Sequence, residues 1–531
     1  MAERRLQGVM AATGIAVGPI WSAERNVAPR PAADALDAET ELERLRTAMA
    51  DAAASLGSLG ADGGMGAEIL DFQTEMLADP ALLEEVLPAI AVGRAAAAAW
   101  SAALDDQIAG FRAADDDYFR ARADDLVDLR DRVLDALGGG VRRVDEAPPR
   151  AIVTARDLTP SRFLEADWDR LGGLALGAGS RQSHVAMLAR ARGVPMVVGL
   201  GDAPTSGPAA LDADGGALIV DPEPATLEAF EQRRAVLDER AAAAKAALAG
   251  PALTAKGERI QCLLNLDHAD AVADEVLDGA DGVGLWRTEF LFLDRPTLPT
   301  EDEQAAAYGA LTERLDGRPV VVRTLDVGGD KSLPGVTIPE EGNPFLGLRG
   351  LRLCLERPEL FRPQLRALLR AAAVGPLQIM LPMVTVPAEV VEARALLEDC
   401  LTELRATRTA AAMPSVGMMV ETPASAIGIE RFPVDFVSIG SNDLTQYVMA
   451  AARDAGGRVG RLADPLDPAV LHLIGKVVAD ARHLGLPVSL CGDMAADPIA
   501  AMRLLDLGMT RLSVGPAALG QLKLTVADHG R

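Results

Sequence analysis

The feature that most constrains the fold is a series of eight short apolar segments in the second half of the chain. Between residues 251 and 531, most of these segments are followed by a stretch with helical periodicity. Strands that alternate with helices form parallel sheets, and eight such units in a region of this length are typical of a (β/α)8 barrel. The eight segments are IQCLLNLD, GVGLWRTE, PVVVRTLDVGG, QIMLPMV, SVGMMVET, FVSIGSND, PVSLCGD and RLSVGP.

The first half of the chain changes its pattern twice. Residues 7–22 have the character of short strands, residues 34–138 carry apolar side chains at the spacing of long helices, and strand-like segments resume near residue 150. This order predicts an α/β domain into which a helical subdomain is inserted. A further helical pattern, residues 225–249, ends at a Gly-Pro pair and is predicted to be a linker. The predicted parts are the α/β domain (1–24 and 143–224), the helical subdomain (25–142), the linker (225–250) and the barrel (251–531).

Composition excludes several classes of protein. The net charge of −25 argues against binding to nucleic acid, because neutralising phosphates requires clustered Lys and Arg. No segment approaches the roughly 18 apolar residues of a membrane span. The four cysteines lie far apart, without the spacing of a zinc site or a disulfide framework. We therefore expect a cytoplasmic protein that does not insert into a membrane.

Several basic residues follow the predicted barrel strands or lie in the loops after them, where catalytic groups of such barrels project. Guanidinium groups around one barrel mouth indicate a small, multiply charged anion, because they bind carboxylate and phosphate bidentately. Lys331 is one of only five lysines and could place a point charge on a phosphate. Taken singly, each arginine could instead be solvated or paired with an acid. The arginines are Arg287, Arg323, Arg349 and Arg453.

Other strand ends carry acidic, amide and thiol groups. Glu421 and Asp443 could supply two oxygen ligands to Mg²⁺, which usually completes its shell with substrate phosphate and water. Cys491 ends the seventh segment and could exchange a proton with a substrate carbon. The alternatives are that the two carboxylates cap the helices that follow them and that the cysteine is a small buried hydrophobe.

One of only five histidines, His184, stands where a Gly- and Ser-rich loop turns into an alanine-rich helical pattern, RQSHVAMLARARGVP. Ser183 is predicted to be the N-cap, which makes His184 the first helical residue. The N–H groups and the dipole at a helix N-terminus favour a phosphate dianion, and Gly177 and Gly179 allow the backbone to approach closely. The alternative is a histidine that only helps to cap the helix and packs against a neighbour.

These segments resemble a known family. GVGLWRTEFLFLDR, VVVRTLDVGGDKSLP, NPFLGLRG, GMMVETPA, SIGSNDLTQY and LCGDMAAD closely resemble the PEP-binding barrel of the phosphoenolpyruvate (PEP)-utilising enzymes. They are most similar to Enzyme I of the bacterial PEP:sugar phosphotransferase system. The resemblance covers essentially the whole chain, since RDLTPS, the Ser-His pair and the inserted helices match in order. It implies that PEP phosphorylates His184, that pyruvate is released, and that the phosphoryl group then passes to a histidine of the carrier HPr, the first step of PEP-dependent sugar uptake.

The resemblance also implies a role for each candidate residue. Mg²⁺ would be bound by Glu421 and Asp443, and Cys491 would protonate the enolpyruvate carbon. The inserted helices would bind HPr, and the barrel domain would form a homodimer. Lys331 would lie near the phosphate. PEP would be held by Arg287, Arg323, Arg349, Arg453 and Asn442.

Three positions depart from the family pattern, and other interpretations stay open. Ser180 and Gln182 stand where Gly and Thr are usual, and Ala452 precedes Arg453 where Asp is common. A nucleotide-linked relative such as PEP synthase would need an ATP-binding domain, for which the residues before 150 leave no room beside the helices. A pathway-dedicated paralogue and a degenerate regulator that binds PEP without turnover are the remaining alternatives.

Overall fold

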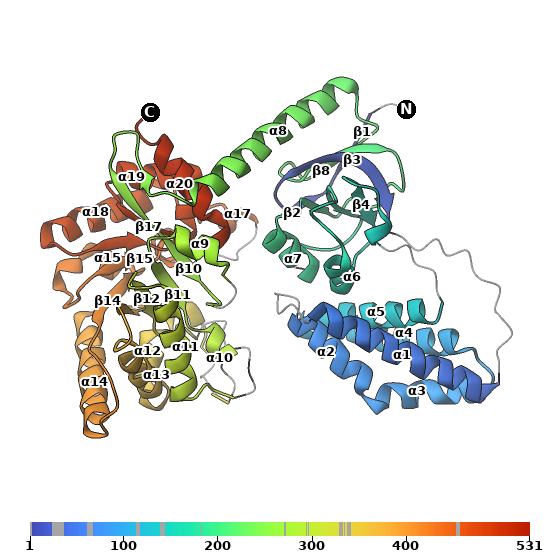
Figure 1. Cartoon of the computed structure of the whole chain (residues 1–531), viewed down its shortest axis with the longest axis horizontal. Coiled ribbons are helices and arrows are strands. Elements are labelled where there is room, and N and C mark those ends of the chain that lie inside the picture. The colour runs from blue at the N-terminus through green and yellow to red at the C-terminus, as the bar shows by residue number, and fades with distance from the viewer. Residues whose placement is uncertain are drawn as a thin grey trace. The chain divides into compact units, whose positions relative to one another are not determined.

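The structure is a computed structural model of the chain, which divides into two units, Met1–Asp238 and Glu239–Arg531. Figure 1 labels the elements of each. The described residues are 3–23, 37–60, 67–112, 117–138, 144–181, 183–269, 272–293, 295, 297–328, 333, 335, 336, 341–452 and 457–531.

An eight-stranded sheet forms the α/β part of the first unit, with the strand order β1-β8-β7-β3-β4-β5-β6-β2. Its centre, β3-β4-β5-β6, is parallel, and the outer strands pair antiparallel. Because β3 and β4 are neighbours in the sheet, the helices between them form an insertion. Two helices, α6 (Pro160–Glu165) and α7 (His184–Arg192), connect the parallel strands. The strands are β1 (Arg4–Gln7), β2 (Val9–Ala12), β3 (Ile15–Ser22), β4 (Ile152–Ala155), β5 (Gly173–Leu176), β6 (Met196–Val198), β7 (Pro208–Asp212) and β8 (Ala217–Val220).

The inserted helices pack around an apolar core of their own. The fully buried Trp100 and Leu104 are part of this core. They are one helical turn apart and therefore lie on the same face of their helix. Leu164 of α6 packs against both this core and the core of the α/β part. The helices are α1 (Ala38–Gly60), α2 (Ala67–Ala78), α3 (Pro80–Ala91), α4 (Ala96–Arg112) and α5 (Asp117–Ala136).

The boundary between the two units falls within a long helix, α8 (Pro224–Ala247), which has no buried residue. Near its start, Leu227 and Phe230 pack against the α/β sheet. At the other end, Lys523 Nζ donates hydrogen bonds to the carbonyl oxygens of Leu248 and Gly250, at 2.9 and 2.6 Å.

The second unit is a closed barrel of eight parallel strands, which confirms the predicted (β/α)8 fold. Strand β10 pairs with both β11 and β17 and so closes the ring, and the short β9 (Ala252–Leu253) adds to it antiparallel. Figure 1 shows the helices around the outside of this ring. The barrel strands are β10 (Arg259–Leu266), β11 (Val283–Arg287), β12 (Val320–Arg323), β13 (Leu377–Leu381), β14 (Ser415–Val420), β15 (Val437–Ile439), β16 (Val488–Leu490) and β17 (Arg511–Val514).

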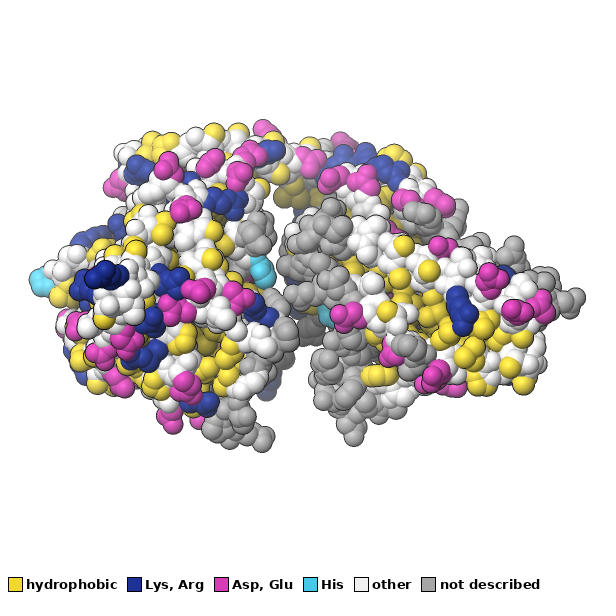
Figure 2. Space-filling model, turned by 60° about the horizontal axis from the view of Figure 1, so that its bottom comes forward, with side chains coloured by type: hydrophobic (Ala, Val, Ile, Leu, Met, Phe, Trp, Pro, Cys, Tyr) yellow, Lys and Arg dark blue, Asp and Glu magenta, His cyan; other side chains and the backbone are white. Residues whose placement is uncertain are grey.

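Alternation along the barrel strands divides their side chains between two apolar clusters. Val321 of β12 belongs to a small cluster with Met380, Met419 and residues of other strands, whereas Val320 and Val322 belong to the large cluster shared with the helices. Acidic and basic side chains are interspersed on the barrel face seen in Figure 2. The helices are α9 (Asp274–Gly279), α10 (Phe290–Leu293), α11 (Glu301–Arg314), α12 (Leu351–Glu356), α13 (Pro358–Ala371), α14 (Pro387–Ala406), α15 (Pro423–Ile427), α16 (Ser441–Met449), α17 (Gly457–Gly460), α18 (Pro468–Leu484), α19 (Pro498–Asp506) and α20 (Leu519–Asp528).

Candidate active site

Two arginines end neighbouring barrel strands. Arg287 of β11 and Arg323 of β12 are register partners, so their side chains start from the same end of the barrel. Arg287 is partly exposed, and its Nη1 donates to Oδ1 of Asp267 at 2.9 Å. A cavity of about 280 Å³ opens beside it, lined by residues that include Asn265, Asp267 and Asp493. The cationic end of Arg287 is therefore accessible from a space large enough for a small ligand.

Arg323 is buried among carboxylates. Its Nη2 lies 3.0 Å from Oε1 of Glu289, and its Nη1 lies 3.0 Å from Oδ2 of Asp326. Burial would lower the pKa of this guanidinium, but the two carboxylates raise it above its ordinary value, and Glu421 adds to the effect. Arg323 thus remains a fixed positive charge inside the barrel mouth.

Arg349 lies between two carboxylates. Its Nε and Nη2 donate to the two oxygens of Asp326, at 3.1 and 3.0 Å, and its Nη1 and Nη2 donate to the two oxygens of Asp443, at 2.9 and 3.3 Å. Burial opposes its charge, yet Asp326 and Asp443 raise the pKa of Arg349 above its usual value. Asp326 therefore joins Arg323 and Arg349 into one network.

Glu421 follows β14 and has no exposed surface. Its Oε1 accepts a hydrogen bond from the backbone N–H of Met383, whereas its Oε2 has no hydrogen-bond partner among the residues that the structure describes. Burial, and secondly the charge of Asp443, raise the pKa of Glu421 well above that of an ordinary glutamate. Gly440 permits this placement, because a side chain there would meet Oε2 at 2.9 Å. An uncompensated buried carboxylate oxygen is costly by itself and would be satisfied by a cation.

The remaining predicted groups of the barrel mouth lie on α16 and after β16. Asn442 Nδ2 donates to Asp493 Oδ2, and the Asp493 N–H donates to Asn442 Oδ1, both at 3.0 Å. The Sγ of Cys491 is 3.6 Å from the carbonyl oxygen of Ile439, and only 3% of the residue is exposed. Burial raises the pKa of Cys491, so the thiol keeps its proton at neutral pH.

His184 belongs to the first unit. It is the first residue of α7, and Ser183 caps the helix by accepting a hydrogen bond from the Ala186 N–H at 3.2 Å, as the sequence predicts. Arg190 fixes the preceding loop by donating to the carbonyl oxygen of Arg181 at 2.9 Å. Gly177 is required at its position, because a side chain there would meet the carbonyl oxygen of Gly201 at 2.2 Å. The imidazole is thus presented, half-buried, on a rigid helix start.

Family models match along the chain in the order of its parts. Residues 7–122 match the PEP-utilising enzyme N-terminal model, residues 147–229 match the mobile-domain model, and residues 241–530 match the PEP-binding-domain model. The last match alone covers more than half of the chain. The chain belongs to the PEP-utilising enzyme family.

Curated relatives place it further within the PEP-utilising enzymes. The phosphoenolpyruvate-protein phosphotransferase of Geobacillus stearothermophilus is 38% identical over 537 residues, which cover 97% of this chain and 92% of that protein. The protein of the same name from Bacillus subtilis (strain 168) is 37% identical over 97% of this chain and 93% of its own. A multiphosphoryl transfer protein of Rhodobacter capsulatus is 39% identical over 98% of this chain and 64% of its own. The chain is therefore an enzyme of the phosphotransferase class.

The barrel mouth of this PEP-utilising enzyme contains residues that the sequence did not single out. Glu289, Asp326 and Asp493 pair with predicted site residues. Each stands two or three residues after a predicted site residue at a strand end, and this position is the signal that could have indicated them. Lys331 and Arg453 lie outside the described residues, as does Gln182. Among the described residues, no helix has both the length and the apolar character needed to cross a membrane.

Proposed function

We propose that this enzyme transfers a phosphoryl group from PEP to its own His184 and then to a histidine of the carrier HPr, as Enzyme I of a phosphotransferase system. The observation that carries the proposal is the cluster at one end of the barrel. There, Arg323 and Arg349 share Asp326, and the carboxylate of Glu421 faces the same network with an unpartnered oxygen. Such fixed charges suit a small substrate that carries both phosphate and carboxylate groups.

In the first step, His184 attacks the phosphorus of PEP. A nitrogen–phosphorus bond forms as the bond between phosphorus and the enol oxygen breaks, and the enol oxygen becomes the ketone oxygen of pyruvate. Cys491 gives its proton to the methylene carbon, which is a role that a buried, protonated thiol can fill. The phosphate and carboxylate of PEP are bound and oriented by four arginines, Arg287, Arg323, Arg349 and Arg453. Asn442 adds an amide at the edge of the site, and Lys331 adds a further positive charge near the phosphate.

A magnesium ion fits the two carboxylates proposed for it. Glu421 Oε2 is buried and has no partner in the described part of the chain, and the neighbouring Asp443 carboxylate lies at the start of α16. Among the described residues, no set of three or more His, Cys, Asp or Glu side chains could enclose a metal. Glu421 and Asp443 would therefore hold Mg²⁺ together with substrate and water oxygens. When bound, the ion would neutralise charge on the phosphate.

His184 and the arginines belong to different units, so the first step requires the two units to meet. We place the flexible connection in α8, which has no buried residue. The helical subdomain, α1 to α5, is the proposed binding surface for HPr. We further propose a cytoplasmic location and a homodimer formed through the barrel.

Incubation with radiolabelled PEP and MgCl₂, followed by peptide mapping, tests this function. We expect one acid-labile phosphate on the peptide that contains His184, and its transfer to purified HPr. His472→Ala, at an exposed position of α18, is the matched control and should be labelled like the wild type. Absence of label from the His184 peptide of the wild-type enzyme would contradict the proposal.

A further inference from the structure

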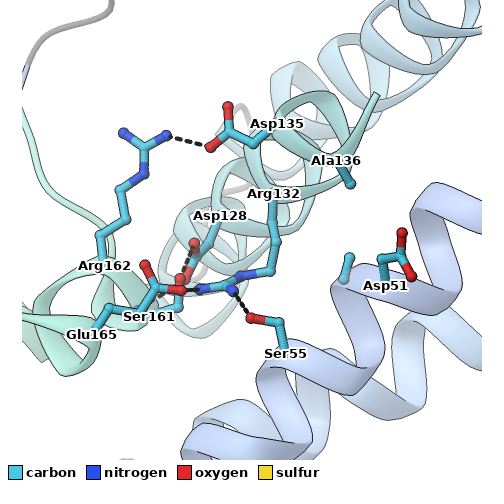
Figure 3. A pocket seen from close by; sticks show the side chains of 10 residues that line it. Asp51, Ser55, Asp128, Arg132, Asp135, Ala136, Ser161, Arg162 and Glu165 are labelled. Carbon is cyan, nitrogen blue, oxygen red and sulfur yellow. Dashed lines mark hydrogen bonds and ion pairs between the residues drawn. The ribbon is translucent and has the colours of Figure 1, made fainter. Parts of the chain in front are cut away.

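One face of α5 carries three charged side chains at the spacing of successive helical turns. Asp128, Arg132 and Asp135 are separated by four and three residues and so point the same way. They face α6 of the α/β part, as Figure 3 shows. Each has a partner there, and the partners are Ser161, Glu165 and Arg162 respectively. We call this set of three pairs the α5–α6 clasp.

Asp128 is the buried member of the clasp. Its Oδ1 accepts a hydrogen bond from Ser161 Oγ at 2.6 Å, and its Oδ2 accepts one from the Ser161 N–H at 3.1 Å. Oδ2 also accepts from Gln73 Nε2 of α2 at 3.2 Å. Asp128 is only 2% exposed, and Ser161 and Gln73 are fully buried. One carboxylate thus ties two helices of the helical subdomain to the first turn of α6.

The two other pairs surround a cavity between the parts. Arg132 Nη2 lies 2.6 Å from Glu165 Oε1, and its Nη1 donates to Ser55 Oγ of α1 at 2.7 Å. Arg162 Nη2 lies 3.1 Å from Asp135 Oδ2. The cavity they line measures about 290 Å³. Leu164 makes an apolar contact across the junction, but the cavity leaves the junction incompletely filled, so its geometry also depends on these directed contacts.

The partner helix α6 is packed against the helix that begins with His184. Phe163 of α6 shares an apolar cluster with Val185 and Leu188 of α7. Phe163 also stacks on Trp168, at 4.7 Å between ring centroids, and lies under the guanidinium of Arg192. A displacement of α5 relative to α6 is thus a displacement of the helical subdomain relative to His184.

We infer that Asp128, with Arg132 and Asp135, is a positioning residue for the second phosphoryl transfer, from His184 to the carrier. This inference rests on the proposed function, in which the carrier docks on the helical subdomain while its histidine must reach His184. Reacting atoms must approach to about 3–3.5 Å, and a misplacement of about 1 Å can cost about a hundredfold in rate. The first transfer, from PEP, takes place at the arginines of the barrel, none of which belongs to the clasp, so we expect it to depend less on the clasp than the second transfer does.

Rapid-quench measurements follow the two half-reactions separately, the phosphorylation of His184 by PEP and the transfer from His184 to HPr. In Asp128→Asn and Ser161→Ala, phosphorylation by PEP should stay within about twofold of the wild type. Transfer from the phosphorylated enzyme to purified HPr should slow by about tenfold or more. Asp131→Asn is the matched control, because it makes the same change on the same helix and Asp131 pairs only within it, with Arg130. The control should match the wild type in both steps.

Exchanging the two charges of the Arg132–Glu165 pair keeps the test decisive if one of the single variants folds poorly. Arg132→Glu and Glu165→Arg should each slow transfer to HPr, and the double variant should recover most of the rate, which a general loss of stability would not do. Normal transfer to HPr in Asp128→Asn, or failure of the double variant to recover, would overturn the inference. Failure of the wild-type enzyme to accept phosphate from PEP would instead overturn the proposed function.

Discussion

Asp326 holds Arg349 through two hydrogen bonds, from Nε at 3.1 Å and from Nη2 at 3.0 Å, while one of its oxygens also lies 3.0 Å from Arg323. A single buried carboxylate thus sets the separation of two guanidiniums in the barrel mouth. Because both guanidiniums are held by Asp326, their separation is fixed before an anion arrives.

Replacing Asp326 by Asn should weaken PEP binding, because the amide carries no negative charge and turns an NH₂ donor, in place of the second acceptor oxygen, toward a guanidinium. We expect KM for PEP in the phosphorylation of His184 to rise by about tenfold, which corresponds to about 1.4 kcal/mol. Asp302→Asn is the control, since the Asp302 carboxylate is 85% exposed and pairs with Arg370 of α13, which is not a predicted site residue. An unchanged KM in Asp326→Asn would remove the carboxylate from substrate positioning.

Magnesium should stabilise the enzyme through Glu421. A ligand that binds only the folded state raises Tm, and the rise grows with the logarithm of its concentration above Kd. The buried Oε2 offers an unsatisfied oxygen to a cation. Differential scanning fluorimetry with MgCl₂ and no PEP should therefore raise Tm of the wild type but not of Glu421→Gln. An equal shift in both proteins would place the ion elsewhere.

The thiol of Cys491 should react slowly with alkylating reagents at neutral pH. Its pKa lies above that of a free cysteine because the side chain is buried, so the thiolate fraction at a given pH is smaller and grows as pH rises. Peptide mapping after iodoacetamide treatment at a series of pH values measures this rate. Alkylation that is already complete near pH 7 would contradict the prediction.

Cys491→Ser tests the proton donor itself. The serine hydroxyl is close in size, so we expect the fold and PEP affinity to persist, while turnover falls by about a hundredfold or more because a hydroxyl is a much weaker acid. Calorimetric titration with PEP and Mg²⁺ measures the affinity, and pyruvate release measures the turnover. Wild-type turnover in this variant would exclude the thiol from the reaction.

His184→Ala should bind PEP as the wild type does. The histidine belongs to the first unit, whereas the arginines and carboxylates of the barrel mouth belong to the second. The same calorimetric titration decides the point, and a large loss of affinity would show that the two sites are not separate. No phosphoenzyme should form in this variant.

The barrel and its polar strand ends were predictable because each strand is a short apolar segment, and several of these segments are followed directly in sequence by a candidate functional residue. Arg323 and Glu421 are examples, since they stand at or directly after β12 and β14. The partners of these groups were less predictable, because pairs such as Arg349 and Asp443 are 94 residues apart and meet only in the folded barrel. The α5–α6 clasp was missed for the same reason, because each of its pairs joins two different helices.

The pairing of Arg349 with Asp443 also bears on which anions the site admits. A dianion that arrives without a metal ion must take the guanidinium away from a resident carboxylate and leave that carboxylate unpaired. With the magnesium site proposed above, a ligand that brings a divalent cation would provide a replacement for the guanidinium at Asp443. Inorganic phosphate alone should therefore be a poor competitor, and the enzyme can discriminate against an abundant metabolite with no added steric barrier.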